Sequence, residues 1–303
     1  MENHSFIKFV PGVYVIYLSV PKVASSSISY AMLNRQPTAS PDMSEHSPEG
    51  KALTHWRSIE SPHPGLPIFT LTRHPIDKFL SYYKDKFVRA RGRGFELDHL
   101  RRLKFDPDMS LEEVVKHMMT IPVEKMEHHA QPQHRILIKK GRLIPDFVGQ
   151  VENIEEEWPL IREVSLCDFS IDQKKNTTRT QDQKIQVSDS VLSALSAYYA
   201  EDFDIFNYER PELTDRSIKV MRPKSSFNKR EIDSLKDKIT ERRHKFKTLS
   251  DFLKNDQKYR KKYLEDRKKQ FNIFMMHNNY MSSKVDSFYV AALKRVMRMV
   301  RRQ

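Results

Sequence analysis

Short apolar runs alternate with longer segments of helical periodicity along the first two thirds of the chain. Three apolar runs are typical of buried strands: Gly12–Val20, Leu66–Thr72 and Pro145–Val151. Apolar residues at three- and four-residue spacing predict five helices: Ser25–Asn34, Pro75–Ala90, Ser110–Thr120, Asn153–Val164 and Ser188–Ala200. Because strands that alternate with helices form βαβ units, we predict an α/β fold with a mainly parallel sheet flanked by helices.

The pattern changes near residue 213, between Pro211 and Pro223. Beyond this point, charged residues dominate and the periodicity is helical throughout. It predicts three helices: Lys229–Phe252, Asp256–Phe274 and Val285–Arg302. We therefore divide the chain into an α/β domain, residues 1–212, and a basic α-helical C-terminal extension, residues 213–303.

The net charge of +13 comes from this extension. Residues 215–303 contain 26 Lys and Arg residues against 10 Asp and Glu residues, whereas residues 1–214 contain 27 against 30. The last predicted helix is amphipathic and basic, which suits an anionic membrane surface or an acidic polymer. Nucleic acid is a less favoured partner, because aromatic residues are not interleaved with the basic ones as a stacking platform.

Cysteine usage and the N-terminal pattern bear on the cellular compartment. Cys167 is the single cysteine among 303 residues, so an internal disulfide is excluded and a reducing compartment is indicated. The apolar segment from Phe6 to Val20 contains Lys8 and Pro11 and is too short to span a bilayer. We expect a cytoplasmic protein without a signal peptide or membrane anchor.

The turn after the first predicted strand has the composition of an anion-binding loop. It consists of Pro21, Lys22, Val23, Ala24, Ser25, Ser26 and Ser27. Small residues let a phosphate approach the backbone at the start of a helix, where Ser25 or Ser26 can act as the cap and Lys22 adds an ammonium. The arrangement is P-loop-like, although it lacks the pattern G-x-x-x-x-G-K-[ST]. An ordinary strand-to-helix turn with a serine cap is the alternative.

A second strand, turn and helix follows about fifty residues later. Arg73 ends the strand, Pro75 suits a first helical turn, and Ser81 lies eight residues after Arg73. An arginine fork and a hydroxyl are good phosphate partners if Arg73 folds back across the helix. The helix is expected to turn an apolar stripe inward: Ile76, Phe79, Leu80 and Tyr83. The alternative is a capping arginine beside an exposed serine.

Together, the two phrases resemble the sulfotransferases that use 3′-phosphoadenosine-5′-phosphosulfate (PAPS), in particular the carbohydrate sulfotransferase branch, sulfotransferase family 2. In that family a P-K-x-x-[ST]-[ST]-like loop holds the 5′-phosphosulfate, which Pro21 to Ser27 match here. An element R-x-P-x-x-R-x-x-S-x-Y holds the 3′-phosphate, matched by Arg73, Pro75, Ser81 and Tyr83. Lys78 stands at the second arginine of that element, which keeps the charge and loses the planar fork.

Later phrases extend the resemblance over residues 12–210. The segment His129-Ala-Gln-Pro132-Gln133 looks like the family's H-x-x-P-Q phrase. The segments 146–152 and 198–208 look like its later landmarks. Asn176 and Thr178 stand where the family carries a short Asn-x-Ser/Thr element near the nucleotide, although a plain solvated loop is the simpler interpretation of these two residues.

The resemblance implies transfer of a sulfuryl group from PAPS to a hydroxyl or amine, with a carbohydrate favoured as acceptor and no metal required. Lys22 and the loop amides would stabilise charge on the leaving oxygen. Histidine suits the general base. His55 lies where related uronic-acid sulfotransferases place a catalytic histidine, His129 is its competitor, and Glu60 stays open.

Two other classes of function remain open from the sequence. The first is a noncatalytic nucleotide-binding module in which the basic extension performs the function. The second is a P-loop kinase acting on a small molecule, which would need a Walker loop and a magnesium-binding acid after a second strand. Arg73-His74-Pro75 stands where that acid is expected.

Overall fold

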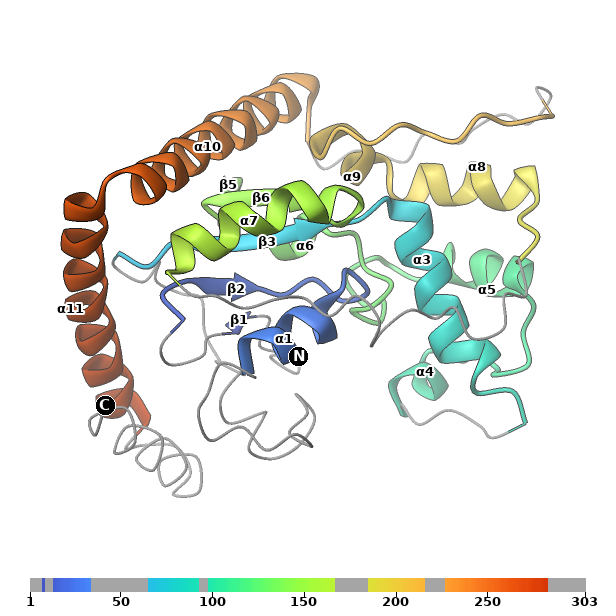
Figure 1. The fold of residues 1–303 in the computed structure, drawn as a ribbon. Coiled ribbons are helices and arrows are strands. Elements are labelled where there is room, and N and C mark those ends of the chain that lie inside the picture. The colour runs from blue at the N-terminus through green and yellow to red at the C-terminus, as the bar shows by residue number, and fades with distance from the viewer. Residues whose placement is uncertain are drawn as a thin grey trace.

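The computed structural model describes residues 7–8, 13–33, 65–92, 98–166, 185–215 and 227–282, and in this part a four-stranded sheet lies at the centre (Figure 1). Its strands in spatial order are β1 (Ile7–Lys8), β2 (Ile16–Leu18), β3 (Ile68–Thr72) and β6 (Phe147–Gln150). β2, β3 and β6 are parallel, and β1 pairs antiparallel with β2. The predicted α/β fold with a mainly parallel, helix-flanked sheet is confirmed, while the P-loop-like character of the first turn stays a prediction.

The strands lie inside their predicted runs. β3 is buried at all five positions and β2 at all three, as expected for a sheet covered on both faces. β2 is shorter than the run Gly12–Val20 that predicted it. β1 and the hairpin of β4 (Ile138–Lys139) and β5 (Arg142–Leu143) were not predicted, because two-residue strands leave no periodicity to detect.

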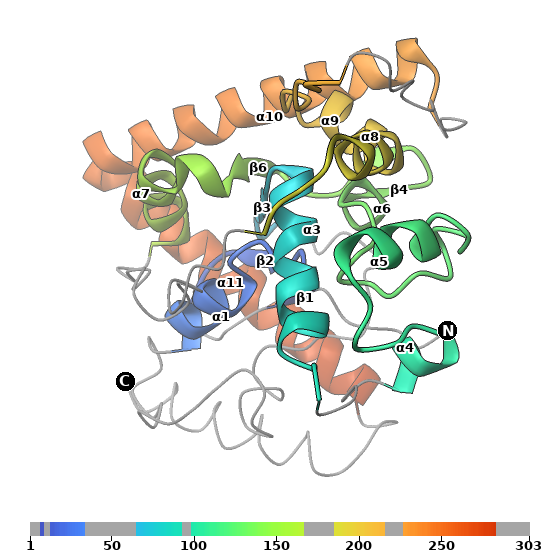
Figure 2. The ribbon, with the colours of Figure 1, turned by 90° about the vertical axis from the view of Figure 1, so that its right-hand side faces the viewer.

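All five helices predicted for the α/β domain are present, with ends shifted by a few residues. They are α1 (Ser25–Leu33), α3 (Pro75–Tyr83) with its continuation η1 (Lys84–Val88), α5 (Leu111–Met118), α7 (Ile154–Ser165) and α8 (Asp189–Tyr198). The short elements α4 (Asp98–Arg102), α6 (His134–Leu137), η2 (Val151–Asn153) and α9 (Ala200–Ile205) were not predicted. α1 and α7 lie on one side of the sheet (Figure 2).

Two apolar clusters stabilise the fold. The first surrounds the sheet and includes Phe147 of β6 and Phe69 of β3, whose ring contacts that of Trp158 on α7. The second joins α3, α5 and α8, with Phe79, Tyr199 and Phe203 at its centre. Figure 1 shows the second group of helices at the end of the sheet to which β3 leads. The turns that follow β2 and β3 therefore lie between the two clusters.

The first helix of the extension, α10 (Lys229–Asn255), packs against the sheet rather than apart from it. Phe246 stacks on Phe147 of β6 with ring centroids 4.5 Å apart. Arg243 pairs with the buried Glu157 carboxylate at 2.7 Å, and Arg242 donates to the backbone oxygens of Leu143 and Pro145. The domain boundary near residue 213 stays a prediction about composition, since α10 shares the core of the α/β domain.

The second helix of the extension, α11 (Gln257–Ser282), lies at the other end of the sheet from α3 and α5 (Figure 1). Its Gln270 side chain faces Gly65, just before β3 begins, so closely that a Cβ on Gly65 would lie 2.7 Å from Gln270 Cδ. None of the helices in the described residues is long and apolar enough to cross a membrane. The predicted helix Val285–Arg302 lies outside those residues.

The packing of α10 predicts a contrast between two phenylalanines of that helix. Phe246→Ala removes a side chain that is 4% exposed, so we expect a loss of about 3–5 kcal/mol in the free energy of unfolding. Phe252→Ala, at a position 54% exposed, is the matched control and should change it by about 0.5 kcal/mol or less. Urea unfolding measures both, and equal small losses would show that α10 is not part of the core.

Candidate functional site

The two turns singled out in the sequence meet at one edge of the sheet. β2 and β3 are parallel neighbours, with Ile16 opposite Ile68 and Tyr17 opposite Phe69, so their carboxyl ends lie side by side. The Arg73 guanidinium, just beyond β3, donates from Nη1 to the backbone oxygen of Lys22 at 3.2 Å. The structure thus brings together the loop Pro21 to Ser27 and the start of α3.

The first turn has an unusual backbone. Lys22 and Ala24 have φ angles of 65° and 49°, in the left-handed region that few residues other than glycine adopt. Such strain concentrates at functional sites, where the backbone must present its N–H groups in a fixed direction. Val23, between them, is fully buried and anchors the turn in the core.

The serines follow the turn as the first residues of α1. The Ala24 oxygen accepts the first helical hydrogen bond, from the Ile28 N–H at 3.0 Å, so the helix begins at Ser25. The prediction that Ser25 or Ser26 caps this helix is therefore wrong, because both lie inside its first turn. The N–H groups of a first turn have no partner within the helix, and the helix dipole is positive there, which favours an anion.

The second turn is fixed through the backbone of Arg73. Gln133, fully buried, accepts from the Arg73 N–H at 2.9 Å and donates to the Arg73 oxygen at 2.8 Å. Pro75 is the first residue of α3, as predicted, and Ser81 lies half-buried two turns later. The arginine and its loop are therefore held before any ligand arrives.

The Lys78 side chain is directed at the loop before α6. It is fully buried, and Nζ donates to the backbone oxygens of His129 and Gln131, each at 2.8 Å. Burial lowers the pKa of Lys78 to about 8. The inward stripe of α3 also differs from expectation, since Tyr82 is fully buried while Leu80 is half-buried.

Asp85, which the sequence analysis did not single out, forms an ion pair with Lys22. The pair links the first turn to η1, and the two side chains are 16% and 24% exposed. Lys86 and Arg89 contact the same carboxylate, at 3.0 and 3.1 Å. Burial raises the pKa of Asp85, but Lys22 and Lys86 outweigh it and lower the pKa to about 2.

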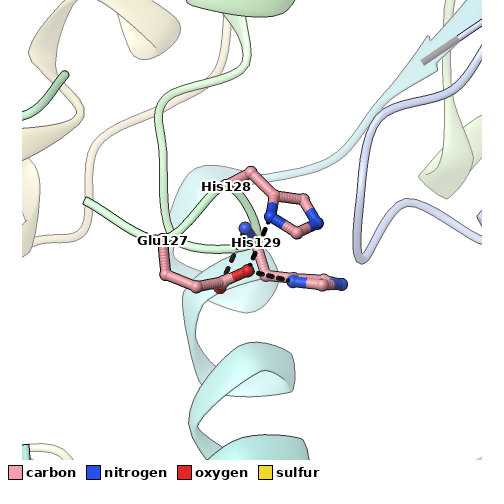
Figure 3. Close-up of side chains that lie close together, drawn as sticks. All are labelled: Glu127, His128 and His129. Carbon is pink, nitrogen blue, oxygen red and sulfur yellow. Dashed lines mark hydrogen bonds and ion pairs between the residues drawn. The ribbon is translucent and has the colours of Figure 1, made fainter. Parts of the chain in front are cut away.

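The loop before α6 carries a histidine held by a buried carboxylate. Glu127, 2% exposed, accepts from His129 Nδ1 at 2.5 Å and from His128 Nδ1 at 2.8 Å. Figure 3 shows both imidazole rings turned toward this one carboxylate. Because a carboxylate only accepts, each Nδ1 carries a proton.

The electrostatics of this cluster leave His129 with a free lone pair. Burial lowers the pKa of His129 to about 4, although the Glu127 carboxylate raises it. Burial raises the pKa of Glu127, but hydrogen bonds from the two histidines outweigh it and lower the pKa well below its usual range. At neutral pH His129 is therefore a neutral imidazole with its proton on Nδ1 and an acceptor at Nε2.

Glu127, His128 and His129 also make up a set of donors that zinc prefers in proteins, with ligand atoms within 4.8 Å of one another. In this arrangement both Nδ1 atoms face the same carboxylate oxygen at hydrogen-bonding distance, where their protons lie. The expectation that no metal is needed stays a prediction.

A buried network supports the loop from the side of α9. The fully buried Asp202 carboxylate accepts from the N–H groups of Gln133 and His134, at 2.7 and 2.9 Å. The His134 imidazole lies between Asp202, 2.8 Å from Nδ1, and Glu201, 2.9 Å from Nε2. Burial lowers the pKa of His134, but the two carboxylates outweigh it and raise the pKa to about 9.

Segments 146–152 and 198–208, which resemble the family's later landmarks, meet behind Arg73. Glu152 accepts from the His74 N–H at 2.7 Å and from the Tyr208 hydroxyl at 3.2 Å. Thr72 bridges the Gly149 oxygen and the Tyr208 hydroxyl, each at 3.0 Å. The two segments together therefore fix the end of β3.

Several predicted site residues are not placed by the structure. His55, Glu60, Asn176 and Thr178 lie outside the described residues. The site residues missed from the sequence are Asp85, Glu127 and Asp202. Asp85 lies one helical turn after Ser81, and Glu127 lies two residues before His129, so each had a weak positional signal. Asp202 lies in the segment 198–208 that resembles the family, but the pattern did not give its role, which depends on a contact 69 residues away.

The fold and the site define an α/β protein in which a strained turn at a helix start and an arginine lie side by side at one edge of the sheet. A family model described as the sulfotransferase family matches residues 8–209, about two thirds of the chain, and the chain belongs to this family. The chain matched no curated protein and no solved structure.

The Asp202–His134 network predicts a pH-dependent stability. A histidine whose pKa is about 9 when folded and about 6.5 when unfolded stabilises the fold fully below pH 6.5, and this stabilisation is lost as the pH rises to 9. We expect a loss of about 3 kcal/mol over that interval. Urea unfolding at both pH values measures it, with His134→Gln as the variant that lacks this dependence. An equal slope in the two proteins would contradict the prediction.

Proposed function

We propose that this sulfotransferase transfers a sulfuryl group from PAPS to a hydroxyl or amine of a carbohydrate acceptor. The observation that supports the proposal most is the contact between the two turns, in which Arg73 holds the strained backbone of Lys22 at the head of α1. A helix start, an ammonium and a guanidinium at one edge suit a ligand with two anionic ends.

The charges around the edge suit such a ligand. Lys22, Arg73 and Lys78 lie near one another, and Lys86 of η1 and Arg89 just after it add to their positive charge. Asp85, Glu127 and Asp202 balance only part of this charge. Cations that are partly removed from water are stabilised by an anion. We assign Lys22 and the turn from Pro21 to Ser27 to the phosphosulfate, and Arg73 with Ser81 to the 3′-phosphate.

In the transfer the acceptor oxygen or nitrogen bonds to sulfur as the bond from sulfur to the phosphate oxygen breaks, which leaves 3′-phosphoadenosine-5′-phosphate. The Lys22 ammonium and the first N–H groups of α1 stabilise negative charge at the leaving side. The acceptor proton requires a base, and we assign it to His129 Nε2. Glu127 fixes the ring through Nδ1 and stabilises the imidazolium that forms.

We assign the base to His129 because the fold holds its loop in place, whereas His55 lies outside the described residues. The loop of His129 is tied down on two sides, by the Lys78 ammonium and by the Tyr199 hydroxyl, which donates to the Ala130 oxygen at 2.6 Å. A base must be held within reach of the proton it removes. His55 stays a competing candidate, and Glu60 a third.

The location and further partners are proposals from the sequence. We propose a cytoplasmic protein whose basic extension contacts an anionic membrane surface or an acidic polymer, with nucleic acid less favoured. Lys258, Lys261 and Lys262 of α11 are exposed, at the end of the sheet opposite the candidate site. A partner of α11 would therefore bind away from the reacting groups.

A comparison of nucleotides tests the proposed donor. We expect 3′-phosphoadenosine-5′-phosphate to raise the melting temperature of the protein more than ATP with Mg²⁺ does. A preference for ATP would favour the P-loop kinase instead. Nucleotide binding without label transfer to any glycan, lipid or peptide in a panel would favour the noncatalytic module.

The assignment of Lys22 predicts a loss of transfer. Lys22→Ala should reduce the rate of sulfuryl transfer from radiolabelled PAPS by about 10²–10³-fold, because one preorganised donor to the leaving group is removed. Lys125→Ala, which changes an exposed lysine, is the matched control and should behave as wild type. Transfer that survives Lys22→Ala would exclude the proposed site.

The assignment of the base predicts a separate effect at His129. His129→Gln should lower kcat by about 10²–10⁴-fold while the affinity for 3′-phosphoadenosine-5′-phosphate stays unchanged. Calorimetry and steady-state kinetics measure the two quantities. His99→Gln, on the exposed face of α4, is the control, and His55→Gln tests the competitor. If only His55→Gln lowers kcat, the base is His55.

A further inference from the structure

One carboxylate gathers the cations that surround the first turn. Asp85 contacts the Lys22 ammonium, Lys86 Nζ at 3.0 Å and Arg89 Nη1 at 3.1 Å. Of these partners Lys22 is the least exposed, with 16% of its side chain accessible, against 20% and 63% for the other two. The contact between Lys22 and Asp85 joins residues 63 positions apart, so the tertiary fold creates it.

The Lys22 ammonium lies in surroundings that disfavour its charge. Its side chain is largely removed from water, and every other charged group that acts on it strongly is positive. Lys86 of η1 and Arg89 just after it are the cations that lower the pKa of Lys22, and Arg73 after β3 and Lys78 on α3 lie close by. A desolvated ammonium among cations loses its proton unless a carboxylate offsets both effects. Asp85 is that carboxylate.

The local helix geometry sets where Asp85 lies. α3 continues as a π-helical turn over Lys84–Val88, closed by the Arg89 N–H donating to the Lys84 oxygen at 3.1 Å. A π-turn inserts an extra residue into the helical register and re-aims the side chains around it. Asp85 lies in this turn, beyond Ser81 of the same helix, and there it faces Lys22.

We propose that Asp85 is a positioning residue for Lys22, whose carboxylate keeps the ammonium protonated and fixed at the anion-binding turn. The inference rests on the proposed role of Lys22 in sulfuryl transfer. Asp85 acts through Lys22 and does not contact the donor. Its negative charge offsets the burial of Lys22 in the free protein, and its position leaves two of the three ammonium protons for the anion.

The direction of the electrostatic effects agrees with this geometry. Burial lowers the pKa of Lys22, and Lys86 and Arg89 lower it further, whereas the hydrogen bond and charge of Asp85 raise it. Replacing Asp85 by Asn removes the effect that raises the pKa and keeps those that lower it. Lys22 then loses its proton at a lower pH than in the wild type.

Titration of Lys22 in the nucleotide-free protein tests the inference without relying on activity. The protein is acylated briefly with acetic anhydride across a pH series, and the modification of Lys22 is quantified by mass spectrometry. Because only the neutral amine reacts, we expect the Asp85→Asn profile to lie at lower pH than that of the wild type. Asp98→Asn, which changes a carboxylate that is 77% exposed, is the matched control.

Kinetics give the second readout. As the pH rises from 6 to 9, we expect kcat for sulfuryl transfer to fall in Asp85→Asn by about tenfold or more beyond any fall in the wild type. The reason is that neutral Lys22 no longer stabilises charge on the leaving group. Asp85→Glu restores the charge on a longer side chain and should recover the wild-type profile in part. If Asp85→Asn fails to fold, Asp85→Glu and Asp85→Ser serve as the pair.

The outcomes separate the two proposals. Coincident acylation profiles for the wild type and Asp85→Asn would overturn the role of Asp85, whatever the activity. If the profile is shifted but the protein binds no 3′-phosphoadenosine-5′-phosphate, Asp85 keeps Lys22 protonated as proposed, and the proposed function is contradicted. A shifted profile together with the altered pH dependence of kcat supports both.

Discussion

Parallel pairing between β2 and β3 is the constraint on which the site depends. The two strands are buried on both faces, and their register brings the Lys22 turn beside Arg73. Since both strands end at the same edge, two helix starts face the same space. The apolar cores on either side fix this edge, and the buried polar contacts of Gln133 and Asp202 hold the loop beside it.

Charge at that edge is balanced locally and in layers. Lys78 binds two loop oxygens below the surface, where the charges of Asp202 and Glu127 act on it. Lys22 and Arg73 lie nearer to solvent, and Asp85 contacts Lys22 there. Removing charges from water is costly unless partners are close. The remaining positive charge is unbalanced in the free protein, and an anionic ligand would stabilise it.

The sequence predicted the elements better than it predicted the contacts between them. β3 and α3 were predicted because an apolar run, Pro75 and a helical stripe are local signals. The role of Lys78 was not, because its ammonium goes to the oxygens of a loop fifty residues away, which the helical pattern does not encode. Gln133 lies in the segment that resembles the family's H-x-x-P-Q motif. Its two hydrogen bonds with the Arg73 backbone depend on the tertiary fold, which that motif does not encode. Sequence periodicity records which face of a helix is buried and not what lies against it.

The basic extension shows why a count of charges misleads about partners. Arg242 and Arg243 of α10 are occupied by backbone oxygens and by the buried Glu157, and Phe246 fills the core beside β6. These arginines serve the fold. The exposed lysines of α11 lie past the opposite end of the sheet from Arg73 (Figure 1). The effect of a surface charge falls off within about 8 Å in physiological salt, so these lysines act on a partner at their own end and add little to the field at the candidate site.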